Sequence, residues 1–242
     1  MNPRVLPPEA WKLVHQLDGA GAALLEPWTL AGGTGLALQL GHRISNDLDF
    51  FLADRFDVGA LRRSLADLGA LEIQYQDENT LHVRLNAIRL SYLRAEAPFL
   101  HPPLKYRGLR LADPRDIAAM KIIAIAGRGS RKDFVDVYAY LEAGGDFPGL
   151  MEIVRRRHAN VSFNQVHLLR SLVYFDDAED EPMPRMLHKV DWPEIRARLE
   201  EEVRRWVPCW WRRAGAEIGL QYNNMLGSIH LSGVIWLMWV II

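Results

Sequence analysis

Two aspartates stand two residues apart in the run Asn46-Asp47-Leu48-Asp49-Phe50-Phe51-Leu52. Side chains alternate between the two faces of a strand, so this run predicts a strand on which Asp47 and Asp49 share one face. Carboxylates that close repel each other unless a cation lies between them. Mg²⁺ binds one or two carboxylates together with phosphate oxygens, so the pair is a candidate site for Mg²⁺ or Mn²⁺ bridging to a triphosphate. The alternative is a solvated strand end.

Three small residues, Gly32-Gly33-Thr34, precede the aspartates. Residues 28–31 before them predict a short strand, and the leucines at 36, 38 and 40 suit a short helix. Glycines between a strand and a helix let backbone N–H groups approach an anion at the helix amino terminus, where the dipole favours phosphate. Gly32, Gly33 and Thr34 are therefore candidate phosphate-binding residues, although the same three residues also suit a plain turn.

The pair His42-Arg43 lies between these glycines and the aspartates. Arg43 is a candidate for contact with phosphate, while capping of a helix end is the alternative for both residues. The histidines farther along the chain, His82 among them, show no metal-ligand spacing and are expected at the surface or as hydrogen-bonded core residues.

A second charged group lies in the carboxy-terminal half. Lys121 and Arg128 are seven residues apart and so share one helix face, and Lys132, Asp133 and Asp136 follow at the start of the next predicted helix. The group is a candidate nucleotide-binding set, in which Lys121 or Arg128 contacts the phosphates and an aspartate orients a base or a metal-bound water. The alternative is an ion-pair network that joins the two helices.

The elements that must position these residues divide the chain in two. Up to residue 112, helices and strands mix: we expect a helix within 9–25, a helix capped by Asp57, and strands at 71–76, 81–85 and 88–93. From Asp113 the pattern is helical, with further helices from Arg131 and over 149–157, 162–174 and 193–207, and an acidic loop at 176–184. The expected fold is α+β: a mixed sheet in a core of residues 1–112, and a helical region over 113–207 that completes the active site.

Composition excludes several classes of protein. Lys and Arg total 29 against 30 Asp and Glu, so the total charge gives no general attraction to nucleic acid or membrane, and one cysteine excludes an internal disulfide. No secretory signal pattern is visible, and a cytoplasmic protein is expected. Residues 229–242 are apolar but shorter than the roughly 18 residues that span a bilayer as a helix. Residues 208–242 form an apolar tail of different character, as a shifted reading frame from about Val207 would give.

Taken together, the two charged groups resemble the nucleotidyl transferase AbiEii/AbiGii toxin family, whose members are often toxins of abortive-infection toxin–antitoxin systems. The resemblance spans about residues 30–206. It rests on residues 30–34 and 42–51, on Lys121, Ala124 and Arg128, and on Lys132, Asp133 and Asp136.

This resemblance implies a polymerase-β-like nucleotidyltransferase core, Mg²⁺ as cofactor and a nucleoside triphosphate as donor. It also implies that the acceptor could be RNA, such as a tRNA end, and that a cognate antitoxin could be a partner. Carried over by motif, Asp47 and Asp49 would bind metal, Lys121 would contact the triphosphate and Asp133 would assist catalysis.

One departure concerns Ser91, which stands where the wider fold usually has a third carboxylate. Either Asp133 or Asp136 compensates, or two-metal catalysis is impaired. Two alternatives to the enzyme therefore remain: a degenerate nucleotidyltransferase fold that binds a nucleotide or a partner without turnover, and a purely structural α/β protein.

Overall fold

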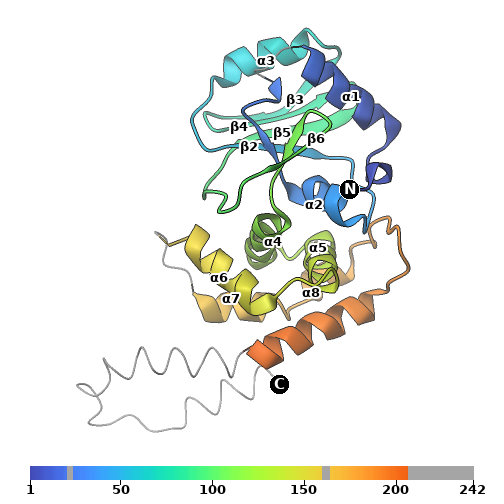
Figure 1. Cartoon of the computed structure of the whole chain (residues 1–242), viewed down its shortest axis with the longest axis vertical. Coiled ribbons are helices and arrows are strands. Elements are labelled where there is room, and N and C mark those ends of the chain that lie inside the picture. The colour runs from blue at the N-terminus through green and yellow to red at the C-terminus, as the bar shows by residue number, and fades with distance from the viewer. Residues whose placement is uncertain (21–23, 160–163, 207–242) are drawn as a thin grey trace, which may run out of the picture.

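A seven-stranded mixed sheet dominates the amino-terminal half of the chain (Figure 1). The structure, a computed structural model, describes residues 1–20, 24–159 and 164–206. The strands lie in the order β3-β4-β5-β2-β1-β7-β6, with β2 parallel to β5 and antiparallel to β1. Their bounds are β1 Thr29–Leu30, β2 Leu48–Leu52, β3 Leu71–Gln76, β4 Thr80–Leu85, β5 Ile88–Arg94, β6 Leu104–Tyr106 and β7 Leu109–Leu111.

The strands predicted at 71–76, 81–85 and 88–93 are confirmed as β3, β4 and β5. Asn86 and Ala87, with φ of 48° and 69°, form the turn between β4 and β5, as a tight hairpin of right-handed strands requires. The β6–β7 hairpin was not predicted. Its turn is Arg107-Gly108, again with two positive φ angles.

Helices make up the carboxy-terminal half of the chain, and other helices lie on both faces of the sheet. After a 3-10 turn at Pro3–Val5, their bounds are α1 Pro8–Gly19, α2 Gly32–Leu40, α3 Val58–Ala66, α4 Pro114–Arg128, α5 Arg131–Glu142, α6 Phe147–Arg157, α7 Gln165–Ser171 and α8 Asp176–Glu179, followed by a helix over 192–206. As predicted, α4 begins with Asp113 as cap and Pro114 at its first position.

Several elements differ from the prediction, and α7, which ends at Ser171, is shorter than the predicted 162–174. The first helix ends at Gly19, earlier than 9–25 suggested. Residues 32–34 form the first turn of α2 itself rather than a turn before it. The acidic stretch 176–184 contains the short helix α8, which is fixed by the burial of Ala178 in the helical core. The predicted tail 208–242 and the ends of two predicted helices, at 162–163 and 207, lie outside the described residues.

Each half has its own apolar core. One face of the sheet packs against α1 and α3 through a cluster that includes Leu17, Leu65 and Tyr92, all 0% exposed. A second cluster joins α4 to α8 and the helix over 192–206, around Phe134. The small cluster of Ala31, Leu36, Ala112 and Ile117 joins α2 to α4. The helical cluster and the small cluster thus hold α2 and α4 against the other face of the sheet, on which Asp47 and Asp49 lie.

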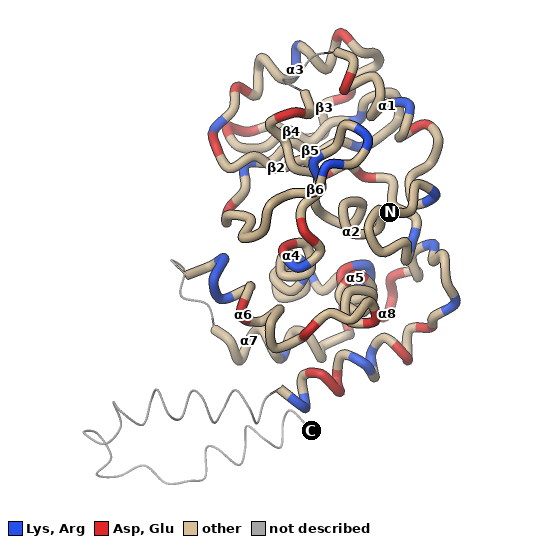
Figure 2. Tube along the Cα trace, in the orientation of Figure 1, with Lys and Arg blue, Asp and Glu red and all other residues tan. Residues whose placement is uncertain are grey.

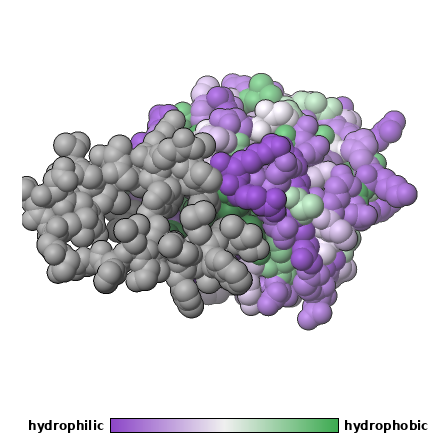
Figure 3. All heavy atoms as spheres, turned by 90° about the horizontal axis from the view of Figure 1, so that it is seen from below, coloured by the Kyte–Doolittle hydropathy of each residue, from purple (hydrophilic) through white to green (hydrophobic). Residues whose placement is uncertain are grey.

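Charged residues of both signs alternate along the chain in both halves, including the helix over 192–206 (Figure 2). Seen from below, the described surface is mostly hydrophilic, with small hydrophobic patches (Figure 3). None of the described helices combines the length and the apolar character needed to cross a membrane.

Candidate active site

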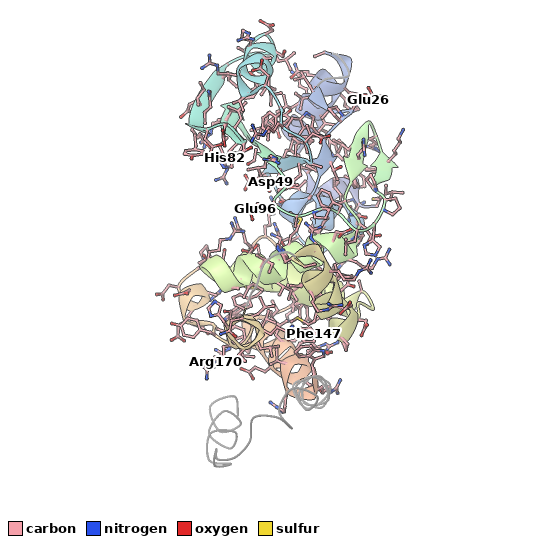
Figure 4. All side chains as sticks on the ribbon, turned by 90° about the vertical axis from the view of Figure 1, so that its left-hand side faces the viewer. Glu26, Asp49, His82, Glu96, Phe147 and Arg170 are labelled. Carbon is pink, nitrogen blue, oxygen red and sulfur yellow. The ribbon has the colours of Figure 1, made fainter. Side chains whose placement is uncertain are left out.

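Asp47 and Asp49 lie at the start of β2 and line one cavity, of about 340 Å³, between the sheet and α4. Along β2, Leu48 and Phe50 are buried in the core, so the aspartates are on the opposite face, as predicted. In Figure 4, Asp49 is at the margin of the sheet that faces the helices.

Asp47 is held in place by its backbone. The Thr34 hydroxyl donates a hydrogen bond to the Asp47 carbonyl oxygen and lies 2.7 Å from Ser45 Oγ. Thr34 is only 1% exposed and does not line the cavity, and its hydroxyl fixes the segment that leads into β2. Asp47 Oδ1 is buried and accepts no hydrogen bond, although Arg89 Nε is 2.8 Å away as an ion pair.

Only glycine fits at positions 32 and 33, because neighbouring side chains occupy the space that a Cβ would need. Gly32 has φ of +60°, and a Cβ there would lie 2.5 Å from Asp49 Oδ2. At Gly33 a Cβ would lie 2.1 Å from Arg43 Nη2. Both glycines line the cavity, but their contacts show that they accommodate a carboxylate and a guanidinium.

We expect Gly33→Ala to lower the free energy of unfolding by about 1–3 kcal/mol, because overpacking would push the Arg43 guanidinium away from its carboxylate partner. Urea unfolding measures this change. Gly127→Ala in α4 is the matched control: its Cβ would meet no atom within 4 Å, and removing a helical glycine should leave stability equal or raise it by about 0.5–1 kcal/mol. Equal stability of Gly33→Ala and wild type would contradict the contact.

Asp136 lies at the centre of a buried ion-pair network below the cavity. It is 0% exposed, and Arg43 donates to both of its oxygens, from Nε at 2.7 Å and Nη2 at 2.9 Å. His42 Nε2 lies 2.8 Å from Oδ1, and Lys121 Nζ 2.8 Å from Oδ2. The network joins the loop after α2 to α4 and α5.

Asp133 is the second buried acid of the network. It accepts from Lys121 Nζ at 2.7 Å and from Arg128 Nε and Nη2 at 2.7 and 3.0 Å. The ion-pair alternative therefore describes these contacts, although Lys132 and Asp136, four residues apart on α5, do not pair with each other.

Burial and ion pairing oppose each other at these groups. Burial alone would raise the pKa of Asp136, but Lys121, Arg43 and His42 outweigh it and hold that pKa well below its usual value. Burial likewise would lower the pKa of Lys121, but Asp136 and Asp133 raise it. Both groups are thus charged throughout the neutral range.

Comparison with known proteins places this arrangement in a family. The profile of the family described as "Nucleotidyl transferase AbiEii toxin, Type IV TA system" matches residues 17–111 and 91–213. The chain belongs to the AbiEii nucleotidyl transferase family. It is therefore a nucleotidyltransferase, as its resemblance to that family predicted.

Individual proteins are also similar to the chain. The chain is 34% identical over 183 residues to the uncharacterized protein aq_aa25 of Aquifex aeolicus (strain VF5), which covers 74% of this chain and 87% of that protein. The crystal structure of JHP933 from Helicobacter pylori matches 89% of this chain and 99% of that chain, with 16% identity and a TM-score of 0.50. The solution structure of the antibiotic-resistance factor ANT(2″)-Ia matches 62% of this chain and 92% of that chain, with 18% identity and a TM-score of 0.47. The likeness to JHP933 concerns the fold.

The cavity of this AbiEii family member brings together most of the residues predicted from sequence. The predicted residues that line it are Gly32, Gly33, Arg43, Asp47, Asp49, Lys121, Arg128 and Lys132. Asp133 and Asp136 lie behind the wall, fully buried. Neither carboxylate lines the cavity; Asp133 holds Lys121 and Arg128, and Asp136 holds Arg43 and Lys121.

The cations differ in how far they reach into the cavity. The Lys121 side chain is 7% exposed and held by both buried acids. The Arg128 side chain is 58% exposed, and its pKa is raised by Asp133 and, more weakly, by Asp49 across the cavity. Lys132 is exposed at the cavity, with no ion pair to any described residue. Arg128 and Lys132 are thus the cations most open to an anion.

Sequence reasoning missed His82, which lines the same cavity. It belongs to β4 between the buried Leu81 and Val83, so it faces the cavity side of the sheet. The register pairs Asp49 with Ser91 and Ser91 with His82, and the three side chains form one row across β2, β5 and β4. The alternation of residues 80–85 could have indicated this face, but only the register brings His82 into line with Asp49.

Proposed function

We propose that the chain transfers a nucleotide from a nucleoside triphosphate to an acceptor hydroxyl, with Mg²⁺ or Mn²⁺ held by Asp47 and Asp49. One observation supports this most: two carboxylates and the cations Lys121, Arg128 and Lys132 line the same cavity. A triphosphate is a ligand whose charge the cations offset, and a divalent cation is the ligand that two adjacent carboxylates require.

The donor atoms fit such a cation. Asp47 Oδ1 accepts no hydrogen bond, although Arg89 forms an ion pair with it, and nothing larger than glycine fits beside Asp49 Oδ2. No group of three or more His, Cys, Asp or Glu side chains is arranged as a metal site among residues 1–20, 24–159 and 164–206, so phosphate oxygens and water would complete the coordination. When bound, the metal would neutralise charge on the reacting phosphate.

The chain's own residues orient the donor. In this proposal Arg128 and Lys132, which line the cavity, contact the β- and γ-phosphates and offset charge on the departing pyrophosphate. Lys121 adds a fixed positive charge at the wall, since Asp133 and Asp136 hold its ammonium group in one position.

We further propose that the acceptor is an RNA and that the chain acts as the toxin of a pair with a cognate antitoxin protein. The description of the AbiEii family, a type IV toxin–antitoxin system, supports this role. Induced expression should then arrest growth of the host, and coexpression of the neighbouring gene's product should restore it.

The direct test is incubation of the full chain with each α-labelled nucleoside triphosphate, Mg²⁺ or Mn²⁺, and total RNA. We expect label in RNA with at least one nucleotide, together with pyrophosphate release. Absence of both with every nucleotide and either metal would reject nucleotide transfer to RNA.

A second candidate function is binding without turnover, which Ser91 favours because a hydroxyl replaces a carboxylate directly opposite Asp49 in the register. Calorimetry distinguishes the two functions. A binding protein takes up the nucleotide stoichiometrically and releases no pyrophosphate, whereas the enzyme releases pyrophosphate when RNA is present.

A further inference from the structure

The geometry points to a nucleobase-binding subsite formed by Tyr75 and His82 on the open face of β3 and β4, where the terminal bases of the acceptor strand stack. This inference rests on the proposed nucleotide transfer and adds the place from which the acceptor enters.

The position of the triphosphate sets the side from which the acceptor oxygen attacks. The glycines and cations lie on the α2 and α4 side of Asp49, where the triphosphate would bind. In phosphoryl transfer the acceptor oxygen forms its bond to the α-phosphorus in line with, and opposite to, the bond that breaks to pyrophosphate. The acceptor therefore approaches from the other side of β2. The sheet order places β5, β4 and β3 there, in succession.

A row of side chains crosses those strands on the cavity face. From Asp49 the register runs through Ser91 on β5 and His82 on β4 to Tyr75 on the edge strand β3. Neighbouring strands are about 4.8 Å apart, so His82 is roughly 10 Å and Tyr75 roughly 14 Å from Asp49 along the sheet. One or two nucleotides span such a distance.

A bulge in β3 places Tyr75 in this row. Ile73 pairs with Val83 on the buried face of the sheet, and strict alternation would put Tyr75 on that face too. The register shift between Ile73 and Tyr75 turns Tyr75 to the cavity face, where its ring centroid is 6.0 Å from that of His82. Bulges commonly redirect side chains beside active sites.

The Tyr75 ring is both available and fixed. Its residue is 53% exposed, and its hydroxyl donates to Asp77 Oδ2 at 2.9 Å. An exposed aromatic ring beside a histidine is a surface on which bases of any sequence stack. In Figure 4, His82 and Asp49 are at the same margin of the sheet.

Two arginines flank the aromatic row. Arg84 and Arg89 pair directly across β4 and β5 on the cavity face. Like charges opposite one another destabilise a sheet, and a phosphate between them would relieve the repulsion. Asp47 forms an ion pair with Arg89, and Glu72 of β3 lies opposite Arg84. The acceptor backbone would therefore meet two arginines whose positive charge is partly neutralised.

The test measures binding of fluorescein-labelled single-stranded RNA of twelve nucleotides by fluorescence anisotropy, using the full chain with Asp49→Asn to prevent turnover. A second probe is an abasic oligomer of equal length, which keeps the phosphates and lacks the bases. Tyr75→Ala should raise the Kd for RNA about tenfold and leave the Kd for the abasic oligomer unchanged, since stacking on an aromatic ring contributes about this factor per base. Tyr75→Phe should stay within about twofold of the parent.

Two further variants complete the design. Ile73 is a similarly exposed apolar residue of β3 on the opposite face, so Ile73→Ala should leave both Kd values unchanged. Arg84→Gln should weaken both probes to the same degree, as a phosphate contact does. Circular dichroism confirms that each variant is folded.

The inference is overturned if the parent chain binds neither probe, if Tyr75→Ala binds RNA as the parent does, or if it weakens both probes equally. Its failure is separable from that of the proposed function because binding needs neither nucleotide nor metal. Label transfer that Tyr75→Ala leaves intact rejects only the subsite. Tyr75-dependent binding without label transfer in the wild type rejects only the enzyme.

Discussion

Asp49→Asn should lower nucleotide transfer by at least about 10³-fold while the chain remains folded. The change keeps the size of the side chain and removes one of the two charges that face the cavity. A bound metal provides several kcal/mol of transition-state stabilisation, and each 1.36 kcal/mol is a factor of ten in rate. The rate of label transfer from the triphosphate measures the effect.

Asp54→Asn is the matched control for this variant. Asp54 is exposed just beyond β2 and does not line the cavity, so its substitution should leave the rate within about twofold of wild type. A nucleotide with Mg²⁺ should also raise the melting temperature of the wild type and of Asp54→Asn but not of Asp49→Asn. Transfer that persists in Asp49→Asn would contradict the role of the aspartate pair.

The local pattern of the sequence was sufficient for the elements closest to the site. Alternation along residues 46–52 placed both aspartates on the face opposite the core, and the Asp113-Pro114 start placed α4. These predictions succeed because strand periodicity and helix caps depend on neighbours in the sequence. The motif resemblance indicated the family and linked Lys121 and Arg128 to the aspartates, and all four residues line the same cavity.

What the sequence did not show depends on contacts between distant segments. Thr34 and Asp47 are 13 residues apart, and only the fold shows that the Thr34 hydroxyl donates a hydrogen bond to the Asp47 carbonyl oxygen. Asp136 and Arg43 are 93 residues apart, so a motif shows that both matter without showing that they pair. His82 enters the site through strand register, which no local pattern specifies.

The last large effect concerns Asp136, whose replacement by asparagine should lower the free energy of unfolding by about 3–5 kcal/mol. Removing one partner of a buried ion pair leaves the others uncompensated, and Arg43 has no second carboxylate within ion-pair distance among the described residues. The whole free energy of unfolding of a typical domain is about 5–15 kcal/mol, so the variant should be only marginally stable. Urea unfolding at neutral pH measures the change. Because Lys121 would lose one of its two anchors, transfer activity should fall as well.

The pH dependence distinguishes this charge effect from a packing defect. The pKa of Asp136 is depressed in the folded state, so its contribution is fully present above the unfolded value near 3.9 and is lost as pH falls through the folded value. The stability gap between wild type and Asp136→Asn should therefore be constant between about pH 5 and 8 and should narrow below about pH 4. Glu142→Gln on the same helix removes an exposed ion pair with Arg198 and should cost less than about 1 kcal/mol. If the stability gap between wild type and Asp136→Asn stays constant below about pH 4, the destabilisation comes from altered packing and not from the lost charge, because only the carboxylate titrates.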